Sequence, residues 1–157
     1  MIALTKRVYL LLIPTILVVL TDEWLKFTGL HRLPQEGSLV KPGLITFAIH
    51  KNWGIAFDIP FKLELVVLIS VLIGLWLIRV AYRHWNDRPG ITFAAIMIMI
   101  GALGNLFDRV RYGFTVDYII LFGHSAINLS DIVIVLGVLL LLLSSQRKKF
   151  DKASEMR

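Results

Sequence analysis

The chain lacks cysteine, and it has few histidines and few charged side chains. Among its 157 residues there is no cysteine, there are four histidines, and only 18% are charged. The absence of cysteine excludes a disulfide scaffold, a cysteine zinc site and a cysteine nucleophile. HExxH and Gly-rich phosphate loops are also absent, and the histidines are dispersed. Serine-protease, metalloprotease and nucleotide chemistry therefore have no support in the sequence.

Apolar residues are abundant instead. They make up 57% of the chain, and the mean hydropathy is +0.74, which is typical of a membrane protein. We predict one membrane domain, residues 1–157, with four spans at about 8–27, 63–82, 91–107 and 126–145. The first run follows two basic residues, but no small-x-small cleavage pattern comes after it, so we interpret it as a retained helix rather than a signal peptide.

The basic residues predict how these spans are oriented. Ten of them fall at the amino end, in the connection between the second and third spans, or in the tail, where only three acidic residues accompany them, a net of +7. The other seven basic residues are accompanied by eight acidic ones, a net of −1, and the two values give the total of +6. The positive-inside rule then places both ends in the cytoplasm and the connections 28–62 and 108–125 outside. In a soluble protein this charge would suggest nucleic acid, but here we expect no such partner.

The first outer connection has a pattern of its own. In GSLVKPGLITFAIH, turn-forming residues bracket strand-like apolar stretches. We therefore predict a mainly α-helical fold, a bundle of four transmembrane helices with a small β-sheet and a loop on the outer side.

Polar residues collect at the outer ends of the first, third and fourth spans. Ionisable groups beside a span are costly and are candidates for function. Asp22 and Lys26 are four apart and can form an ion pair on one helix face. Asn52 and Gly54 lie in NWGIAF, which taken alone predicts only a turn.

The segment GALGNLFDR carries more than a helix end requires. Gly101 and Gly104 would let another helix approach closely. Asn105, Asp108 and Arg109 follow at i, i+3 and i+4 and point one way on a helix.

Two further aspartates lie in apolar surroundings. Asp117 occurs in FTVDYI just beyond the third span, and Asn128 and Asp131 occur at i and i+3 in INLSD at the start of the fourth. No basic residue is adjacent to Asp131, so its carboxylate needs another partner. Two aspartates in a low-dielectric site share a proton, and such a pair can activate water and protonate a scissile carbonyl without a metal. On the residues alone, a transporter or proton channel is an equal alternative, although the acids lie at the outer edge and not across the bilayer.

The ordered motifs are similar to those of one known family. TDEWLK, NWGIAF, GALGNLFDR, VDYI and INLSD together resemble bacterial lipoprotein signal peptidase (signal peptidase II), a membrane aspartic protease. The resemblance covers nearly the whole chain. A presenilin-like or prepilin-type protease is disfavoured because GxGD is absent.

The resemblance implies a function and a set of roles. The family removes signal peptides from diacylglyceryl-modified prolipoproteins on the amino side of the lipobox cysteine, in the bacterial cytoplasmic (inner) membrane, without cofactor or metal, and globomycin inhibits it. Asp117 and Asp131 match the catalytic pair. The residues that match site-shaping or substrate-binding positions are Asn52, Gly54, Asn105, Asp108, Arg109 and Asn128. The supporting positions are Asp22, Lys26, Gly101 and Gly104.

Three positions depart from the family pattern. Ile127 and Ser130 stand in INLSD where the family usually has Phe and Ala, and Asp58 follows NWGIAF where Gly is common. All the acidic and amide positions are present. The resemblance therefore implies the same chemistry, with fine substrate preference open to change.

Overall fold

The computed structural model describes residues 10–38, 43–54, 59 and 61–155. They form four α-helices: α2 (Leu12–Arg32), α3 (Leu63–Arg83), α4 (Pro89–Tyr112) and α5 (Leu129–Glu155). A 3-10 helix, η1 (Glu36–Ser38), follows α2. Several residues used in the sequence analysis lie outside the described part, namely Lys6, Arg7, Ala56, Phe57, Asp58 and Arg157. The prediction of a mainly helical chain with four helices is confirmed.

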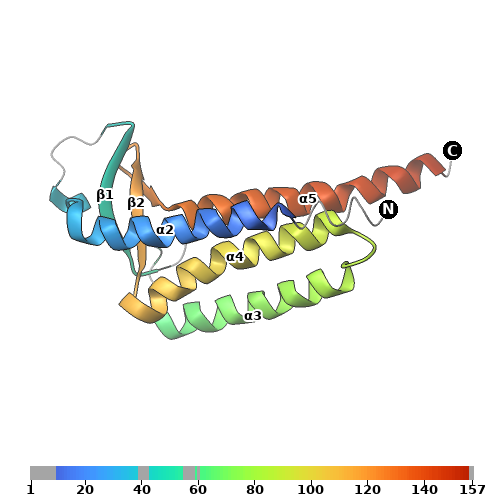
Figure 1. Cartoon of the computed structure of the whole chain (residues 1–157), viewed down its shortest axis with the longest axis horizontal. Helices are drawn as coiled ribbons and strands as arrows, with labels where there is room; N and C mark the ends of the chain where they lie inside the picture. Colours follow the sequence, from blue (N-terminus) through green and yellow to red (C-terminus); the bar gives the residue numbers. More distant parts are fainter. Residues whose placement is uncertain (1–9, 39–42, 55–58, 60, 156–157) are drawn as a thin grey trace.

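The helices lie side by side, and the sheet crosses one end of the bundle (Figure 1). α4 packs against α5, α3 and α2. The start of α2, the connection between α3 and α4, and the end of α5 all point away from the sheet, toward the opposite end of the bundle, beyond which α5 extends (Figure 1). The segments predicted to be cytoplasmic therefore share one end of the molecule.

Three of the four helices are long and apolar enough to cross a membrane. The qualifying stretches are Leu63–Arg83, Pro89–Tyr112 and Leu129–Gln146. Large apolar side chains on α3 such as Leu72 and Leu75 are more than half exposed, as expected of a lipid-facing surface. α2 does not qualify because Asp22, Glu23 and Lys26 interrupt its apolar run. That α2 also crosses the membrane, and that the sheet faces outward, remain predictions.

The sheet has three antiparallel strands in the order β1-β2-β3. β1 (Ile45–Asn52) lies in the first predicted outer connection, where turn residues bracketing apolar stretches indicated a strand. β2 (Thr115–Leu121) lies in the second, and β3 (Ser125–Ile127) begins at its end and continues into the predicted fourth span. The turn between β2 and β3 places Phe122 and Gly123 at positive φ. Both connections therefore contribute to one sheet, and β1 lies beside the strand that carries Asp117.

Several helix boundaries differ from the predicted spans. α2 continues past residue 27 to Arg32 and α5 continues past residue 145 to Glu155, and two further differences concern the polar residues. α4 continues past residue 107 to Tyr112 and ends where Gly113 adopts a left-handed conformation, φ +84°, and donates its N–H to the Arg109 carbonyl. Asp108 and Arg109 are therefore helical. α5 begins at Leu129 and not near residue 126, because residues 125–127 pair with β2. Asn128 is thus the residue before the helix and not part of it.

Glycines bring α4 and α5 close together, as predicted for Gly101 and Gly104. A Cβ at Gly101 would lie 2.9 Å from the Ser130 carbonyl oxygen, and one at Gly104 would lie 2.7 Å from Ser130 Oγ and 3.0 Å from Glu23 Oε1. Gly137 of α5 meets α4 with similar closeness, since its Cβ would lie 2.7 Å from Ile98. These contacts set the start of α5 directly against α4.

Replacing Gly104 should therefore disturb this contact. We expect Gly104→Ala to lower the free energy of unfolding by about 1–3 kcal/mol, since the added methyl group must displace Ser130 Oγ and Glu23 Oε1. The melting temperature in detergent measures the effect. Gly74→Ala on α3 is the matched control, because its Cβ meets nothing within 4 Å and alanine favours a helix by up to about 1 kcal/mol. Equal melting temperatures for the two variants would contradict this account of the α4–α5 contact.

Candidate active site

Asp117 lies in β2, buried where the sheet meets the helices. Its side chain is held by two amides. Asn52 Nδ2 of β1 donates to Asp117 Oδ2 (3.1 Å), and Asn128 Nδ2 donates to Asp117 Oδ1 (2.7 Å). Asp117 is 1% exposed, so almost all of its solvation comes from these donors. The carboxylate therefore lies in a buried, polar environment.

Asp131 lies in the first turn of α5, where it forms a reciprocal capping arrangement with Asn128. The Asn128 N–H donates to Asp131 Oδ2 (3.1 Å), and the Asp131 N–H donates to Asn128 Oδ1 (2.9 Å). Asn105 Nδ2 of α4 donates to the other carboxylate oxygen, Asp131 Oδ1 (2.8 Å). The partner that the sequence required for this aspartate is thus a pair of amide groups and not a base.

Asn128 joins the two aspartates. Its side-chain amide nitrogen reaches Asp117, while its main chain and its side-chain oxygen bind Asp131. Burial and, after it, the negative charge of Asp131 raise the pKa of Asp117 to about 7, against the opposing effects of Asn52, Asn128 and Lys26. The two carboxylates are therefore electrostatically coupled, and Asp117 holds a proton more readily than an ordinary aspartate.

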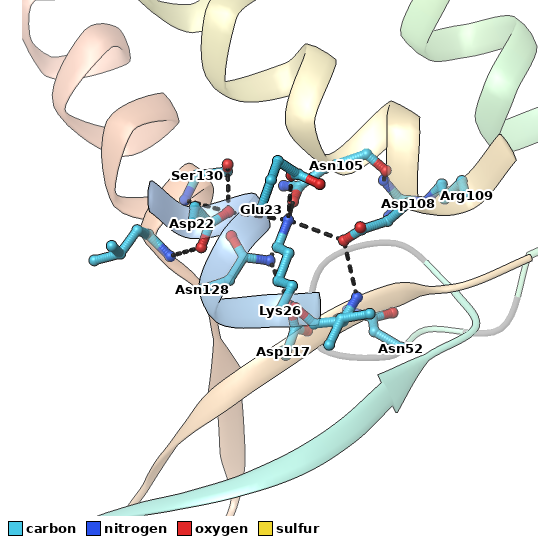
Figure 2. A network of polar contacts seen from close by, with 12 residues as sticks. Asp22, Glu23, Lys26, Asn52, Asn105, Asp108, Arg109, Asp117, Asn128 and Ser130 are labelled. Atoms are coloured by element: carbon cyan, nitrogen blue, oxygen red, sulfur yellow. Dashed lines mark hydrogen bonds and ion pairs between the residues drawn. The ribbon is translucent and has the colours of Figure 1, made fainter. Parts of the chain in front are cut away.

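A buried lysine, Lys26, lies in the polar network near Asp117 (Figure 2). Lys26 Nζ is 2.9 Å from Asp22 Oδ2, 2.9 Å from Asp108 Oδ2 and 3.2 Å from Glu23 Oε1. It also donates to Asn105 Oδ1 (3.2 Å), which accepts from Asn128 Nδ2 as well (3.1 Å). The predicted Asp22–Lys26 pair is confirmed, but it is part of a larger cluster in which one cation compensates three carboxylates.

The carboxylates of this cluster also hold main-chain groups. Asp108 Oδ2 accepts the Val116 N–H (3.1 Å), so it fixes the strand one residue before Asp117. Asp22 Oδ1 accepts the Leu129 N–H (2.9 Å), and Asp22 Oδ2 accepts the Ser130 N–H (3.3 Å). These are the first N–H groups of α5, which have no partner within the helix. Asp22 therefore caps α5 from a different helix.

Arg109 lies beside this network. Its guanidinium donates to the Gly54 carbonyl (3.1 Å) and weakly to the Asn105 carbonyl (3.5 Å), and the Gly54 N–H donates to Asn52 Oδ1 (3.1 Å). The side chain thus connects α4 to the start of the segment that follows β1, whose residues 55–58 lie outside the described part.

The structure brings together all the polar side chains singled out from the sequence. Asn105 and Asp108 share the Lys26 face of α4, whereas Arg109 reaches Gly54 instead. Sequence reasoning missed Tyr118, whose hydroxyl donates to Asp22 Oδ1 (2.8 Å), and Glu23. The available signals were a tyrosine directly after Asp117 and an acid three residues before Lys26. Within the described ranges, no three His, Asp or Glu side chains are grouped so that they could hold a metal ion.

Known proteins share both the sequence and the fold. Residues 14–147 match the family described as signal peptidase (SPase) II. The lipoprotein signal peptidase of Moorella thermoacetica is 33% identical over 133 residues, 83% of this chain and 88% of that protein. The lipoprotein signal peptidase of Geobacter sulfurreducens is 35% identical over 120 residues, 71% of this chain and 74% of that protein.

A solved structure of a bacterial membrane enzyme has the same fold, with a TM-score of 0.75 over 97% of this chain and 93% of the other, at 24% identity. At that identity the likeness concerns the fold alone. The family match covers most of the chain, and two relatives exceed 30% identity over more than two thirds of it. The chain therefore belongs to the signal peptidase II family.

Proposed function

We propose that this chain is a lipoprotein signal peptidase that acts as a membrane aspartic endopeptidase. It removes the signal peptide from diacylglyceryl-modified prolipoproteins on the amino side of the lipobox cysteine. The observation that carries the proposal is a pair of aspartates, the buried Asp117 and the half-buried Asp131, bound to the same asparagine, Asn128. Family membership supports the peptidase activity, and the names of the relatives support the class of substrate.

The proposed reaction uses one proton shared by the two carboxylates. The ionised aspartate takes a proton from water, whose oxygen attacks the scissile carbonyl carbon, while the protonated aspartate donates to the carbonyl oxygen. The tetrahedral intermediate then collapses. The C–N bond breaks, a proton passes to the leaving amine of the lipobox cysteine, and the signal peptide leaves with a carboxylate end. The chemistry requires no metal or cofactor.

The surrounding amide groups donate hydrogen bonds to both aspartates, as a pair with one ionised and one protonated carboxyl group requires. Asn52 and Asn128 donate to Asp117, and Asn105 and the Asn128 N–H donate to Asp131. These donors hold both carboxylates in place in a site from which water is largely excluded. The Lys26 cluster in turn binds Asn105 and, through Asp108, the Val116 N–H next to Asp117. Arg109 and Gly54 are placed to contact the substrate backbone near the segment after β1.

The proposed topology places this chemistry at the outer face of the bacterial cytoplasmic membrane. Both ends of the chain are then cytoplasmic, and the sheet meets the cleavage site of a substrate whose lipid-modified cysteine lies at that surface. The common location of the α2 start, the α3–α4 connection and the α5 end (Figure 1) agrees with the distribution of basic residues.

The proposal is tested by incubating the purified protein with diacylglyceryl-modified and unmodified forms of one prolipoprotein, with and without globomycin. We expect cleavage of the modified form only, at the bond before the lipobox cysteine, and we expect globomycin to block it. Mass spectrometry of both products identifies the bond. Equal cleavage of both forms, or cleavage elsewhere, would contradict the assigned substrate.

The pH dependence of the reaction gives a second test. With Asp131 ionised, the raised pKa of Asp117 means that the pair keeps one proton below about pH 7 and loses it above. We expect kcat to fall as the pH rises through this range. The Asn52 amide stabilises the charged form of Asp117, so Asn52→Ala should raise this pKa and move the alkaline limb of the kcat profile to higher pH.

The control for this variant is Asn86→Ala in the connection between α3 and α4, at the other end of the bundle. Its profile should match that of the wild type. The position of the limb does not depend on the amount of active enzyme, so partial misfolding of a variant cannot imitate the shift. A limb that stays in place or moves to lower pH in Asn52→Ala would show that Asp117 is not the group that titrates.

A further inference from the structure

One carboxylate binds the immediate neighbours of both proposed catalytic aspartates. Tyr118, the residue after Asp117 on β2, donates its hydroxyl to Asp22 Oδ1 (2.8 Å). Ser130, the residue before Asp131 on α5, donates its hydroxyl to Asp22 Oδ2 (2.6 Å). The Asp22 side chain is fully buried. The strand that carries one aspartate and the helix that carries the other are thus tied to one point on α2.

This connection is independent of the one made by Asn128. Asn128 contacts the reacting carboxylates themselves, whereas the Asp22 contacts reach them only through the adjacent residues. Removing a hydroxyl from Tyr118 or Ser130 therefore leaves every direct hydrogen bond to the aspartates in place. The effect of how Asp117 and Asp131 are positioned can therefore be measured separately from the effect of the hydrogen bonds to their carboxylates.

The groups around Asp22 stabilise its negative charge and keep its hydrogen-bond donors protonated. Lys26 Nζ lies 2.9 Å from Asp22 Oδ2 and compensates its negative charge. Burial and the nearby Asp22 carboxylate raise the pKa of the Tyr118 hydroxyl above its usual range, so this hydroxyl keeps its proton and remains a donor. Hydrogen bonds from neutral donors to a buried carboxylate are stronger than hydrogen bonds between two neutral groups.

We propose that Tyr118 and Ser130 are positioning residues that act through Asp22 to fix the separation and orientation of Asp117 and Asp131. This rests on the proposed function, because it assumes that these two aspartates act as a pair. A displacement of about 1 Å within a catalytic site can lower a rate about 100-fold. Loss of either hydroxyl loosens one side of the connection and affects the chemical step more than substrate binding.

The test compares Tyr118→Phe, Ser130→Ala and the double variant with the wild type. Each substitution removes an oxygen and leaves the rest of the side chain. We expect Tyr118→Phe to lower kcat for the diacylglyceryl-modified prolipoprotein about 10-fold while KM changes less than about 2-fold. Ser130→Ala introduces the residue that the family usually has here and keeps the main-chain N–H bonds of residues 129 and 130 to Asp22, so it should lower kcat by a smaller factor. The double variant should lose less than the product of the two single losses, since both residues act through one carboxylate.

The controls carry the same chemical changes elsewhere. Tyr112→Phe removes a hydroxyl from a tyrosine at the end of α4 whose ring stacks on the Phe114 ring and lies against the Arg111 guanidinium. Ser70→Ala removes a hydroxyl that donates to the Val66 carbonyl within α3 (2.8 Å). Both controls should keep the wild-type kcat.

The pH profile separates positioning from a general loss of stability. The charge of Asp131 raises the pKa of Asp117, so moving the carboxylates apart should shift the alkaline limb of kcat to lower pH, opposite to the effect expected for Asn52→Ala. Unchanged kcat and an unchanged limb in Tyr118→Phe and Ser130→Ala, with only a lower melting temperature, would overturn the proposal. If Tyr118→Phe does not fold, Ser130→Ala alone decides it by the same criteria.

The wild type and Asp117→Asn distinguish this proposal from the proposed function. If the wild type fails to cleave the modified prolipoprotein, or Asp117→Asn cleaves it at the wild-type rate, the aspartate pair itself is wrong and the positioning role is overturned with it. If Asp117→Asn is inactive and the two hydroxyl variants behave like the wild type, only the positioning role is wrong.

Discussion

Asp117→Asn and Asp131→Asn should each lower the rate of prolipoprotein cleavage by about 1,000-fold or more. An asparagine cannot accept a proton from water or donate one to a carbonyl oxygen, and general acid–base catalysis contributes about 100- to 10,000-fold per group. Either substitution also removes the proton that the pair shares. The measurement is the single-turnover cleavage rate with diacylglyceryl-modified prolipoprotein and enzyme in excess.

Both variants should still fold. Asparagine has almost the same shape as aspartate, but its NH₂ group cannot accept both donors that each carboxylate receives, from Asn52 and Asn128 at Asp117 and from Asn105 and the Asn128 N–H at Asp131. We expect a cost of about 1–3 kcal/mol in the free energy of unfolding. Glu64→Gln, in the first turn of α3, is the control carboxylate and should keep full activity. Near-wild-type cleavage by a folded Asp117→Asn or Asp131→Asn protein would contradict the assignment.

Lys26→Met should be the most destabilising single substitution considered for this chain. Lys26 is buried and compensates Asp22, Glu23 and Asp108. Methionine fills a similar volume but leaves these carboxylates without a cation, and breaking a buried ion pair in this way costs about 3–5 kcal/mol. We therefore expect a drop of many degrees in the melting temperature in detergent, accompanied by loss of cleavage.

The matched control is Lys62→Met, an exposed lysine just before α3. It should melt within about 1–2 °C of the wild type, because substitutions at exposed positions without special contacts change stability by less than about 0.5 kcal/mol. If Lys26→Met melted at the same temperature as Lys62→Met, the Lys26 cluster would not be the stabilising centre of the site.

Features governed by local spacing could be predicted from the sequence. The Asp22–Lys26 pair follows from a separation of four on a helix, and the closeness of α4 and α5 follows from Gly101 and Gly104. The run of apolar residues predicted the helices because a membrane span requires it. β1 was indicated by an apolar stretch that turn-forming residues precede. In each case the residues that predict the feature lie within one short segment.

Two local signals were present in the sequence but were not recognised. The spacing of Asn128 and Asp131 is that of a capping box, which places Asn128 before the helix and not inside it. Gly113, directly after Tyr112, marks the end of α4. The predicted spans followed hydropathy alone, which reports where lipid can lie against the chain and not where a helix begins or ends.

The contacts between distant segments could not be predicted. Tyr118 and Asp22 are 96 residues apart, and Lys26 and Asn105 are 79 apart. Such contacts depend on how α2, α4 and β2 are placed relative to one another. A residue pattern within one segment does not predict this placement. The sequence therefore indicated nearly all members of the site, but it indicated only one partner for Lys26 and no role for Tyr118.

The most direct measurement of the central claim is a comparison of Asp117→Asn, Asp131→Asn and the double variant by single-turnover cleavage of the diacylglyceryl-modified prolipoprotein. If the two aspartates act as one unit with one shared proton, each single substitution removes the whole of their contribution, so the double variant should cleave no more slowly than the single variants. Losses that multiply in the double variant, or a single variant that retains substantial activity, would show that Asp117 and Asp131 do not form a catalytic pair.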